Sequence, residues 1–110
     1  EVLAGQLSHG EHRQLEIAMA LATRPKLLLL DEPMAGMGQK ESLAMVGIIR
    51  ELKGKLTILL IEHDMDVVFT LADKITVLLN GRCIATDSPE SIRKNPEVKK
   101  AYLGEDNIDA

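Results

Sequence analysis

Two adjacent carboxylates follow an unbroken apolar run in the sequence. Residues 27–32 read LLLLDE, so Asp31 and Glu32 stand where a buried strand would end. In an open parallel sheet, ligands bind outside the carboxyl ends of the strands. One carboxylate there can hold Mg²⁺, directly or through water, and its neighbour can take a proton from an attacking water. The pattern favours nucleotide chemistry; the alternative is that Asp31 caps the next element and Glu32 is solvated.

A candidate anion site lies upstream, where residues 7–11 read LSHGE. Ser8 and Glu11 have the spacing of a capping box at a helix start, and Gly10 allows close approach of backbone. A helix N-terminus that offers free N–H groups, a hydroxyl and a glycine suits an anion. A plain helix start is the alternative, and the Asp-Glu pair downstream favours the anion site over it.

A histidine follows the second apolar run of the chain. The run TILLI, residues 57–61, leads into EHD, so His63 should emerge at the same sheet edge as Asp31 and Glu32. A histidine there can hydrogen-bond a phosphate oxygen or hold a catalytic water. As a lone histidine after a strand, it would instead be structural.

The elements that must position these residues alternate between helices and strands. Apolar residues at helical spacing predict helices over residues 15–22 and 45–52. Leu27–Leu30 and Thr57–Ile61 predict strands buried on both faces, because a half-exposed strand would alternate with polar residues. Strand–helix–strand order with fully apolar strands indicates a parallel sheet.

The C-terminal third of the chain carries different signals. Ile75–Leu79 and Arg82–Thr86 flank Asn80-Gly81, which predicts a hairpin with a type I′ turn. Two small helices are expected to begin at Ser88 and Asn95, each with a proline in its first turn.

The composition narrows the class of protein. A chain of 110 residues is one domain at most, and a net charge of −4 without a basic run argues against a nucleic-acid surface. The single cysteine, Cys83, cannot form an internal disulfide, which suits a reducing compartment. No apolar stretch has the length of a membrane span, and no signal-peptide pattern is present. The first residue is Glu1 rather than Met, which is expected for a fragment or a processed chain.

These motifs, taken in order, resemble the C-terminal half of an ATP-binding cassette (ABC) ATPase. LSHGE resembles the signature motif, LLLLDE the Walker B strand, MAGMG the D-loop and IEHD the switch-histidine region. The hairpin and the tail SPESIRKNPEVKKAYLG resemble, more narrowly, the ATP-binding subunits of branched-chain amino acid importers and their urea or amide relatives. The resemblance covers essentially the whole chain.

The resemblance implies a fold and a domain. It implies an α/β fold: the C-terminal part of a P-loop NTPase (RecA-like) parallel sheet, with flanking helices and a terminal β-hairpin. Residues 1–110 would be the C-terminal portion of an ABC nucleotide-binding domain, and that domain would be incomplete.

The resemblance also implies roles at the strand ends. Asp31 would ligand Mg²⁺, Glu32 would be the general base that polarises the hydrolytic water, and His63 would contact the γ-phosphate of ATP.

At the subunit boundary, the resemblance implies two further groups of residues. The signature, which would bind the ATP held by an opposite subunit, comprises Leu7, Ser8, His9, Gly10 and Glu11. The D-loop, which would line the dimer seam, comprises Gly36, Met37 and Gly38. Three positions depart from the family pattern: His9 replaces a glycine, Glu11 a glutamine, and Gly38 the aspartate that many members carry.

The function implied is that of an ABC-type ATPase, part of the ATP-hydrolysing subunit of an importer for branched-chain amino acids or related small polar solutes. Its cofactors would be ATP and Mg²⁺. Its partners would be a second ATP-binding subunit in a head-to-tail dimer, the transmembrane permease subunits and, indirectly, a periplasmic or extracellular binding protein, with no nucleic acid. Its place would be the cytoplasm, peripheral on the inner face of the membrane.

One motif of the family does not occur in these residues. No G-x-x-x-x-G-K-[ST] loop exists in the sequence, so nothing here would grip the phosphates of a nucleotide bound by the same subunit. The 110 residues alone are therefore expected to be inactive, and they are expected to self-associate through open sheet edges.

Three alternatives remain from the sequence. The chain could be the C-terminal ATPase lobe of a DNA-repair or chromosome-maintenance protein, against which stand its acidic charge, absent heptads and importer-like tail. It could be a non-catalytic interaction module. A metal site formed by His9, His12 and Glu16, which have suitable helical spacing, is a further hypothesis.

Overall fold

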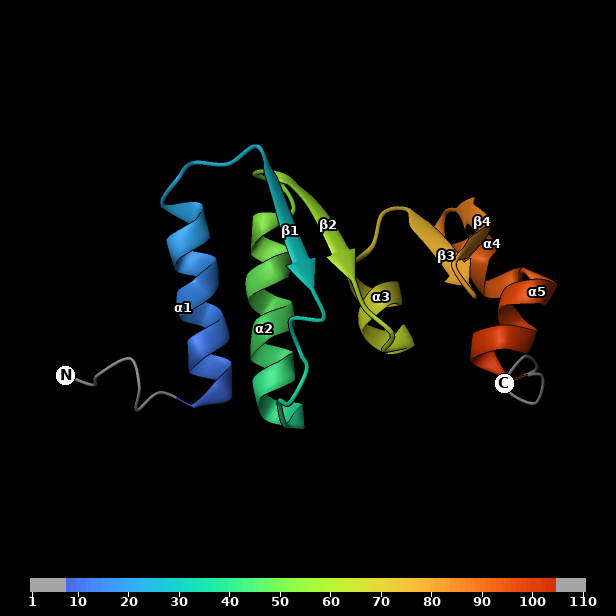
Figure 1. Ribbon diagram of the computed structural model, residues 1–110, viewed down its shortest axis with the longest axis horizontal. Helices are drawn as coiled ribbons and strands as arrows, with labels where there is room; N and C mark the ends of the chain where they lie inside the picture. Colours follow the sequence, from blue (N-terminus) through green and yellow to red (C-terminus); the bar gives the residue numbers. More distant parts are fainter. Residues whose placement is uncertain (1–7, 105–110) are drawn as a thin grey trace. The chain divides into compact units, whose positions relative to one another are not determined.

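The computed structural model describes residues 8–104, which fall in two compact units, residues 8–63 and 64–104. Figure 1 labels the helices and strands of each unit. Unit 1 contains α1 (His9–Leu21), β1 (Leu27–Asp31), α2 (Gln39–Leu52) and β2 (Thr57–Ile61). Unit 2 contains α3 (Met65–Leu71), β3 (Ile75–Leu79), β4 (Arg82–Asp87), α4 (Pro89–Lys94), α5 (Pro96–Val98) and the π-helix η2 (Lys99–Leu103).

The described strands of unit 1 form a parallel pair, as the sequence predicts. β1 and β2 align without a shift, from Leu27 opposite Thr57 to Asp31 opposite Ile61. One more hydrogen bond extends the ladder, because the Glu32 N–H donates to the Ile61 carbonyl at 2.7 Å. The carboxyl ends of both strands therefore lie at one edge of the sheet.

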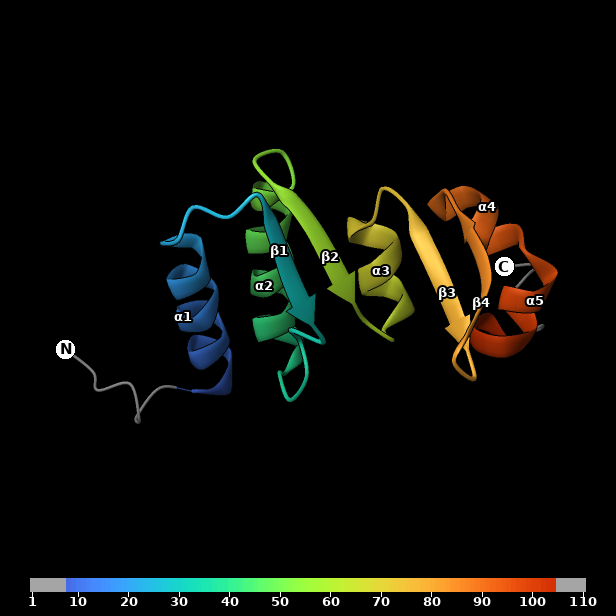
Figure 2. The same cartoon turned by 45° about the horizontal axis from the view of Figure 1, so that its top comes forward.

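Two helices pack on one side of this strand pair. Figures 1 and 2 show α1 and α2 side by side, with α2 behind β1. The helix predicted over residues 45–52 is confirmed, and Met45 and Ile49 are fully buried on its inner face, whereas Ile48 and Leu52 are half-buried. The buried apolar residues of unit 1 are Ile17, Leu28, Leu30, Met34, Met45 and Ile49.

The prediction that both strands are buried on two faces is wrong for the described unit. Burial alternates along β1, where Leu28 and Leu30 are buried while Leu29 keeps 64% of its surface exposed. Leu59 and Ile61 of β2 each keep 54% of their surface exposed. Among the described residues, helices cover only one face, so every second leucine meets solvent.

Unit 2 is built on a hairpin. β3 and β4 pair antiparallel, with a register irregularity at Val77/Leu78. The turn residues Asn80 and Gly81 have φ angles of 52° and 76°, the two left-handed residues that a type I′ turn requires. The predicted hairpin is confirmed.

The tail helices pack against this hairpin. Ser88 and Asn95 cap α4 and α5, and each helix has a proline in its first turn, as predicted. The buried apolar residues described in unit 2 are Val67, Leu71, Ile75, Ile92 and Val98, of which the last three form one cluster. No local sequence pattern indicates the π-helical turn η2, from which the Tyr102 hydroxyl donates to the Leu78 carbonyl. No helix in the described residues has both the length and the apolar character to cross a membrane.

Met45→Ala tests the core of unit 1. Because Met45 has no exposed surface, its truncation should leave a cavity and lower the free energy of unfolding by about 2–5 kcal/mol. Leu43→Ala on the same helix is the matched control: Leu43 is 67% exposed, and its truncation should change stability by about 0.5 kcal/mol or less. Urea denaturation followed by circular dichroism compares the two, and equal effects would contradict this packing.

Candidate functional site

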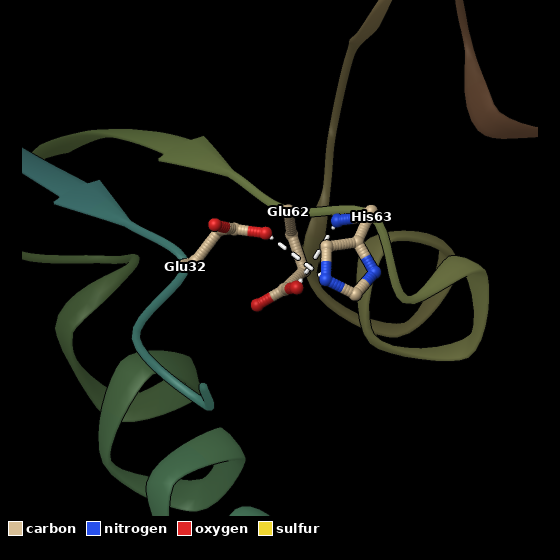
Figure 3. Close-up of side chains that lie close together, drawn as sticks. All are labelled: Glu32, Glu62 and His63. Atoms are coloured by element: carbon tan, nitrogen blue, oxygen red, sulfur yellow. Dashed lines mark hydrogen bonds and ion pairs between the residues drawn. The ribbon is translucent and has the colours of Figure 1, made fainter. Parts of the chain in front are cut away.

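Three polar side chains meet beyond the carboxyl ends of β1 and β2. Figure 3 shows Glu32, Glu62 and His63 converging on one point. His63 Nε2 lies 3.0 Å from Glu32 Oε1, and the His63 backbone N–H donates to Glu62 Oε1 at 3.0 Å. The His63 side chain is 79% exposed and that of Glu32 is 44% exposed, so a ligand can reach both.

The backbone at Glu32 is strained. Its φ is 46°, in the left-handed region that costs a residue with a side chain about 1–2 kcal/mol. The hydrogen bond to the Ile61 carbonyl holds the residue at the end of β1, and the Ala35 N–H donates to the Glu32 carbonyl at 3.0 Å to close the following turn. Strain of this kind persists only where the surrounding structure holds it, and strained residues cluster at functional sites.

The pairing of Glu32 with His63 defines the chemistry available here. A carboxylate within hydrogen-bond distance of an imidazole can accept a proton from a water lying between it and a substrate, while the imidazole donates to an anionic oxygen. The sequence predicted that these two residues share one sheet edge, and the structure brings them together.

Asp31 occupies the last position of β1. It is exposed, on the strand face shared with Leu29, and it lines a hollow of about 280 Å³ with Arg13 and Glu16 of α1. Its carboxylate oxygens are hard ligands of the kind that Mg²⁺ prefers.

The predicted capping box at the start of α1 is present. The Glu11 N–H donates to Ser8 Oγ at 3.2 Å, and the Ser8 N–H donates to Glu11 Oε1 at 3.0 Å. The hydrogen bond from the Ser8 backbone lowers the pKa of the Glu11 carboxyl below 4.5, and the bond with the Ser8 side chain adds to this. The ionised carboxylate is therefore the form that the folded helix start favours.

The N–H groups at this helix start are not all free, which corrects the prediction. The Gly10 N–H donates to Glu41 Oε2 of α2 at 3.1 Å. Gly10 is buried, and a Cβ there would collide with that carboxylate. A carboxylate of the same chain thus accepts from the Gly10 N–H, while Ser8 stays exposed at the helix start.

The D-loop residues form the connection between β1 and α2. Gly36 has a φ of 78°, and a Cβ on it would lie 3.1 Å from the His9 ring. Gly38 is the N-cap of α2, and the Met37 N–H donates to the Met34 carbonyl at 3.1 Å. The structure thus brings His9 of the signature beside Gly36, whereas Leu7 lies outside the described residues.

The metal site proposed from His9, His12 and Glu16 is wrong. Within residues 8–104, the only group of three or more side chains that could hold a metal ion is Glu32, Glu62 and His63. His9 lies against Gly36 instead. Glu16 approaches Arg13 at 3.9 Å.

Sequence reasoning missed two residues of these sites. Glu62 lies between Ile61 and His63, and alternation along a strand predicts that its side chain points to the face opposite to theirs, away from the site. Glu41 is 31 residues from Gly10, and no spacing rule connects them.

Two family models match separate parts of the chain. The model described as "ABC transporter" matches residues 1–35, which include the capping box and the Asp-Glu pair. The model described as "Branched-chain amino acid ATP-binding cassette transporter" matches residues 82–107.

Curated relatives match most of the chain. It is 48% identical over 104 residues to the high-affinity branched-chain amino acid transport ATP-binding protein BraF of Pseudomonas aeruginosa, and 47% identical to LivG of Escherichia coli. Both alignments cover 93% of this chain and 41% of the relative, so the chain spans about two fifths of their length. These relatives support the transporter interpretation over a DNA-repair lobe.

Solved structures give the same result. The chain superposes on a nucleotide-free ATP-binding cassette from an ABC transporter with a TM-score of 0.78 and 37% identity, covering 92% of this chain and 42% of that one. An ATP-binding cassette of an ABC transporter in its ADP conformation matches with a TM-score of 0.78 and 36% identity over the same shares of the two chains.

The depressed pKa of Glu11 predicts an acid-sensitive start of α1. Its contribution to stability is complete above pH 4.5 and is lost as the pH falls through the lower pKa of the folded state. The protection factors of the amides in the first turn of α1, which compare the measured exchange with the intrinsic exchange at the same pH, should therefore fall on acidification, and Glu11→Gln should remove this pH dependence. Glu16→Gln on the same helix, outside the capping box, is the control and should leave it unchanged.

Proposed function

We propose that the chain is the C-terminal portion of a nucleotide-binding domain and contributes to ATP hydrolysis in an importer. The proposal rests on its homology to the ATP-binding proteins of ABC transporters. The proposed cargo is a branched-chain amino acid or a related small polar solute, which the match of residues 82–107 and the relatives BraF and LivG support.

The observation that carries this proposal is the 3.0 Å contact between Glu32 Oε1 and His63 Nε2 at the shared ends of two parallel strands. Glu32 is the proposed general base, which accepts the proton of the attacking water. His63 is the proposed contact to the γ-phosphate, and its interaction with Glu32 holds it beside the same water. Positioning and charge stabilisation of this kind dominate phosphoryl transfer.

Asp31 is the proposed magnesium ligand. Its exposed carboxylate stands on the last residue of β1, directly before the proposed base, and its oxygen donors fit a hard divalent cation. When bound, Mg²⁺ would neutralise charge on the phosphates. ATP is the proposed nucleotide, and its binding would require a phosphate-gripping loop from outside these 110 residues.

Ser8, His9, Gly10 and Glu11, with Leu7 before them, are proposed to contact ATP held by a second ATP-binding subunit in a head-to-tail dimer. The capping box orients the Ser8 hydroxyl at the helix start, where the helix dipole favours an anion. Gly36, Met37 and Gly38 would lie along the seam between the subunits, and the contact of His9 with Gly36 would couple the seam to the signature.

The exposed face of unit 1 supports a larger parallel sheet of the RecA-like type. Its apolar surface is contributed by Leu27, Leu29, Leu59 and Ile61, each more than half exposed in the described unit. Further strands and helices of a complete domain would cover such a face, and a second copy of the isolated chain would pair with its open edges. The proposed partners are permease subunits at the inner face of the membrane, with a binding protein as an indirect partner.

Glu32→Gln in the intact subunit tests the role of the base. Removing the proton acceptor while Asp31 stays should lower kcat by about 10²–10⁴-fold and leave ATP affinity nearly unchanged. Turnover and nucleotide binding measured in parallel check this, with Glu51→Gln, at an exposed position of α2 away from the site, as a control that should change neither. A loss of ATP affinity as large as the loss of turnover would assign Glu32 to binding instead.

Ser8→Arg tests the proposed contact across the dimer. The added bulk and charge at the start of α1 should prevent nucleotide-dependent dimers while each subunit still binds ATP. Light scattering with and without nucleotide measures the dimer, and Ser91→Arg, a change at an exposed serine of α4, should leave it intact. Dimers that persist in the Ser8 variant would contradict the assignment of the signature.

A further inference from the structure

The geometry beyond the strand ends points to a second ligand for this edge of the sheet: we propose that Glu32, Glu62 and His63 bind a d-block divalent cation of the zinc class. One ligand atom from each residue lies within 4.8 Å of the other two. Because zinc–ligand bonds are about 2.0–2.1 Å, tetrahedral ligands lie roughly 3.3 Å apart. Glu32 Oε1 and His63 Nε2 are already 3.0 Å apart.

The types of ligand select the class of cation. Two carboxylates and one imidazole match the mixed oxygen and nitrogen sets that bind zinc, cobalt and related ions, and they supply the charge of −2 that neutralises such an ion. Mg²⁺ prefers six oxygen ligands in near-octahedral geometry and gains little from an imidazole. The cluster is thus distinct in chemistry from the magnesium ligand proposed at Asp31.

The backbone restricts two of the three ligands and leaves the site accessible. Glu32 is held by the hydrogen bond from its N–H to the Ile61 carbonyl, and the Glu62 carboxylate is oriented by the N–H of His63. The exposed His63 and Glu32 side chains leave one side open, so an ion can enter without unfolding and can keep a water as its fourth ligand.

Binding here has a consequence that rests on the proposed function. An ion bound to Glu32 occupies the lone pairs that would accept the proton from water, and an ion on His63 Nε2 removes the donor proposed for the γ-phosphate. Zinc at this cluster should therefore inhibit hydrolysis, in competition with the Mg-nucleotide complex.

Cobalt binding to the 110-residue chain tests the site without any catalytic readout. Co²⁺ should give a visible d–d absorption band with one equivalent bound, which Zn²⁺ abolishes and excess Mg²⁺ does not. His63→Ala and Glu62→Gln should each weaken binding at least tenfold, with unchanged far-ultraviolet circular dichroism. His12→Ala, on α1 and outside the cluster, is the matched control and should bind as the unaltered chain does.

Two sets of outcomes separate the site from its consequence. The absence of a band, an unchanged band in the His63 variant, or a loss in the His12 control would overturn the metal site. Zinc inhibition is then measured in the intact ATPase, relative to the zinc-free rate of each variant. Cobalt binding at the cluster without inhibition by zinc would leave the site standing and would contradict the roles proposed for Glu32 and His63 in hydrolysis.

Discussion

The parallel pairing of β1 with β2 is the constraint on which the site depends. The two strands are separated by a helix along the chain, and their in-register ladder brings Asp31 opposite Ile61. The additional bond from the Glu32 N–H to the Ile61 carbonyl carries this alignment one residue further. A shift of the register by a single residue would move Glu32 by about 3.3 Å along the strand and take it away from His63.

The elements could be predicted from the sequence because their signals are local. The capping box at Ser8, the Asn80-Gly81 turn and the prolines that start α4 and α5 each depend on residues within one turn of the backbone. The common edge of Asp31, Glu32 and His63 follows from one further rule, since parallel strands end on the same side. These parts of the fold and of the candidate site are confirmed by the structure.

The remaining features depend on contacts that no local pattern encodes. An apolar run such as LLLLD shows that a strand is suited to burial, but it does not encode which elements cover its second face, and Leu29 is exposed in the described unit. Glu62 joins the cluster because β2 ends at Ile61 and strict alternation ends with it. The contact of Glu41 with Gly10 joins two helices whose sequences carry no mark of each other.

The left-handed backbone at Glu32 means that the residue best for stability and the residue needed for the proposed chemistry differ at this position. Glycine adopts this conformation without steric cost, so stability alone would favour glycine there over any residue with a side chain. A glutamate at this position retains the backbone strain, and in return its carboxylate reaches His63 across the ends of the two strands. Selection for a higher free energy of unfolding would therefore be expected to replace Glu32, the proposed reactive carboxylate, before it changes the sheet that holds this residue.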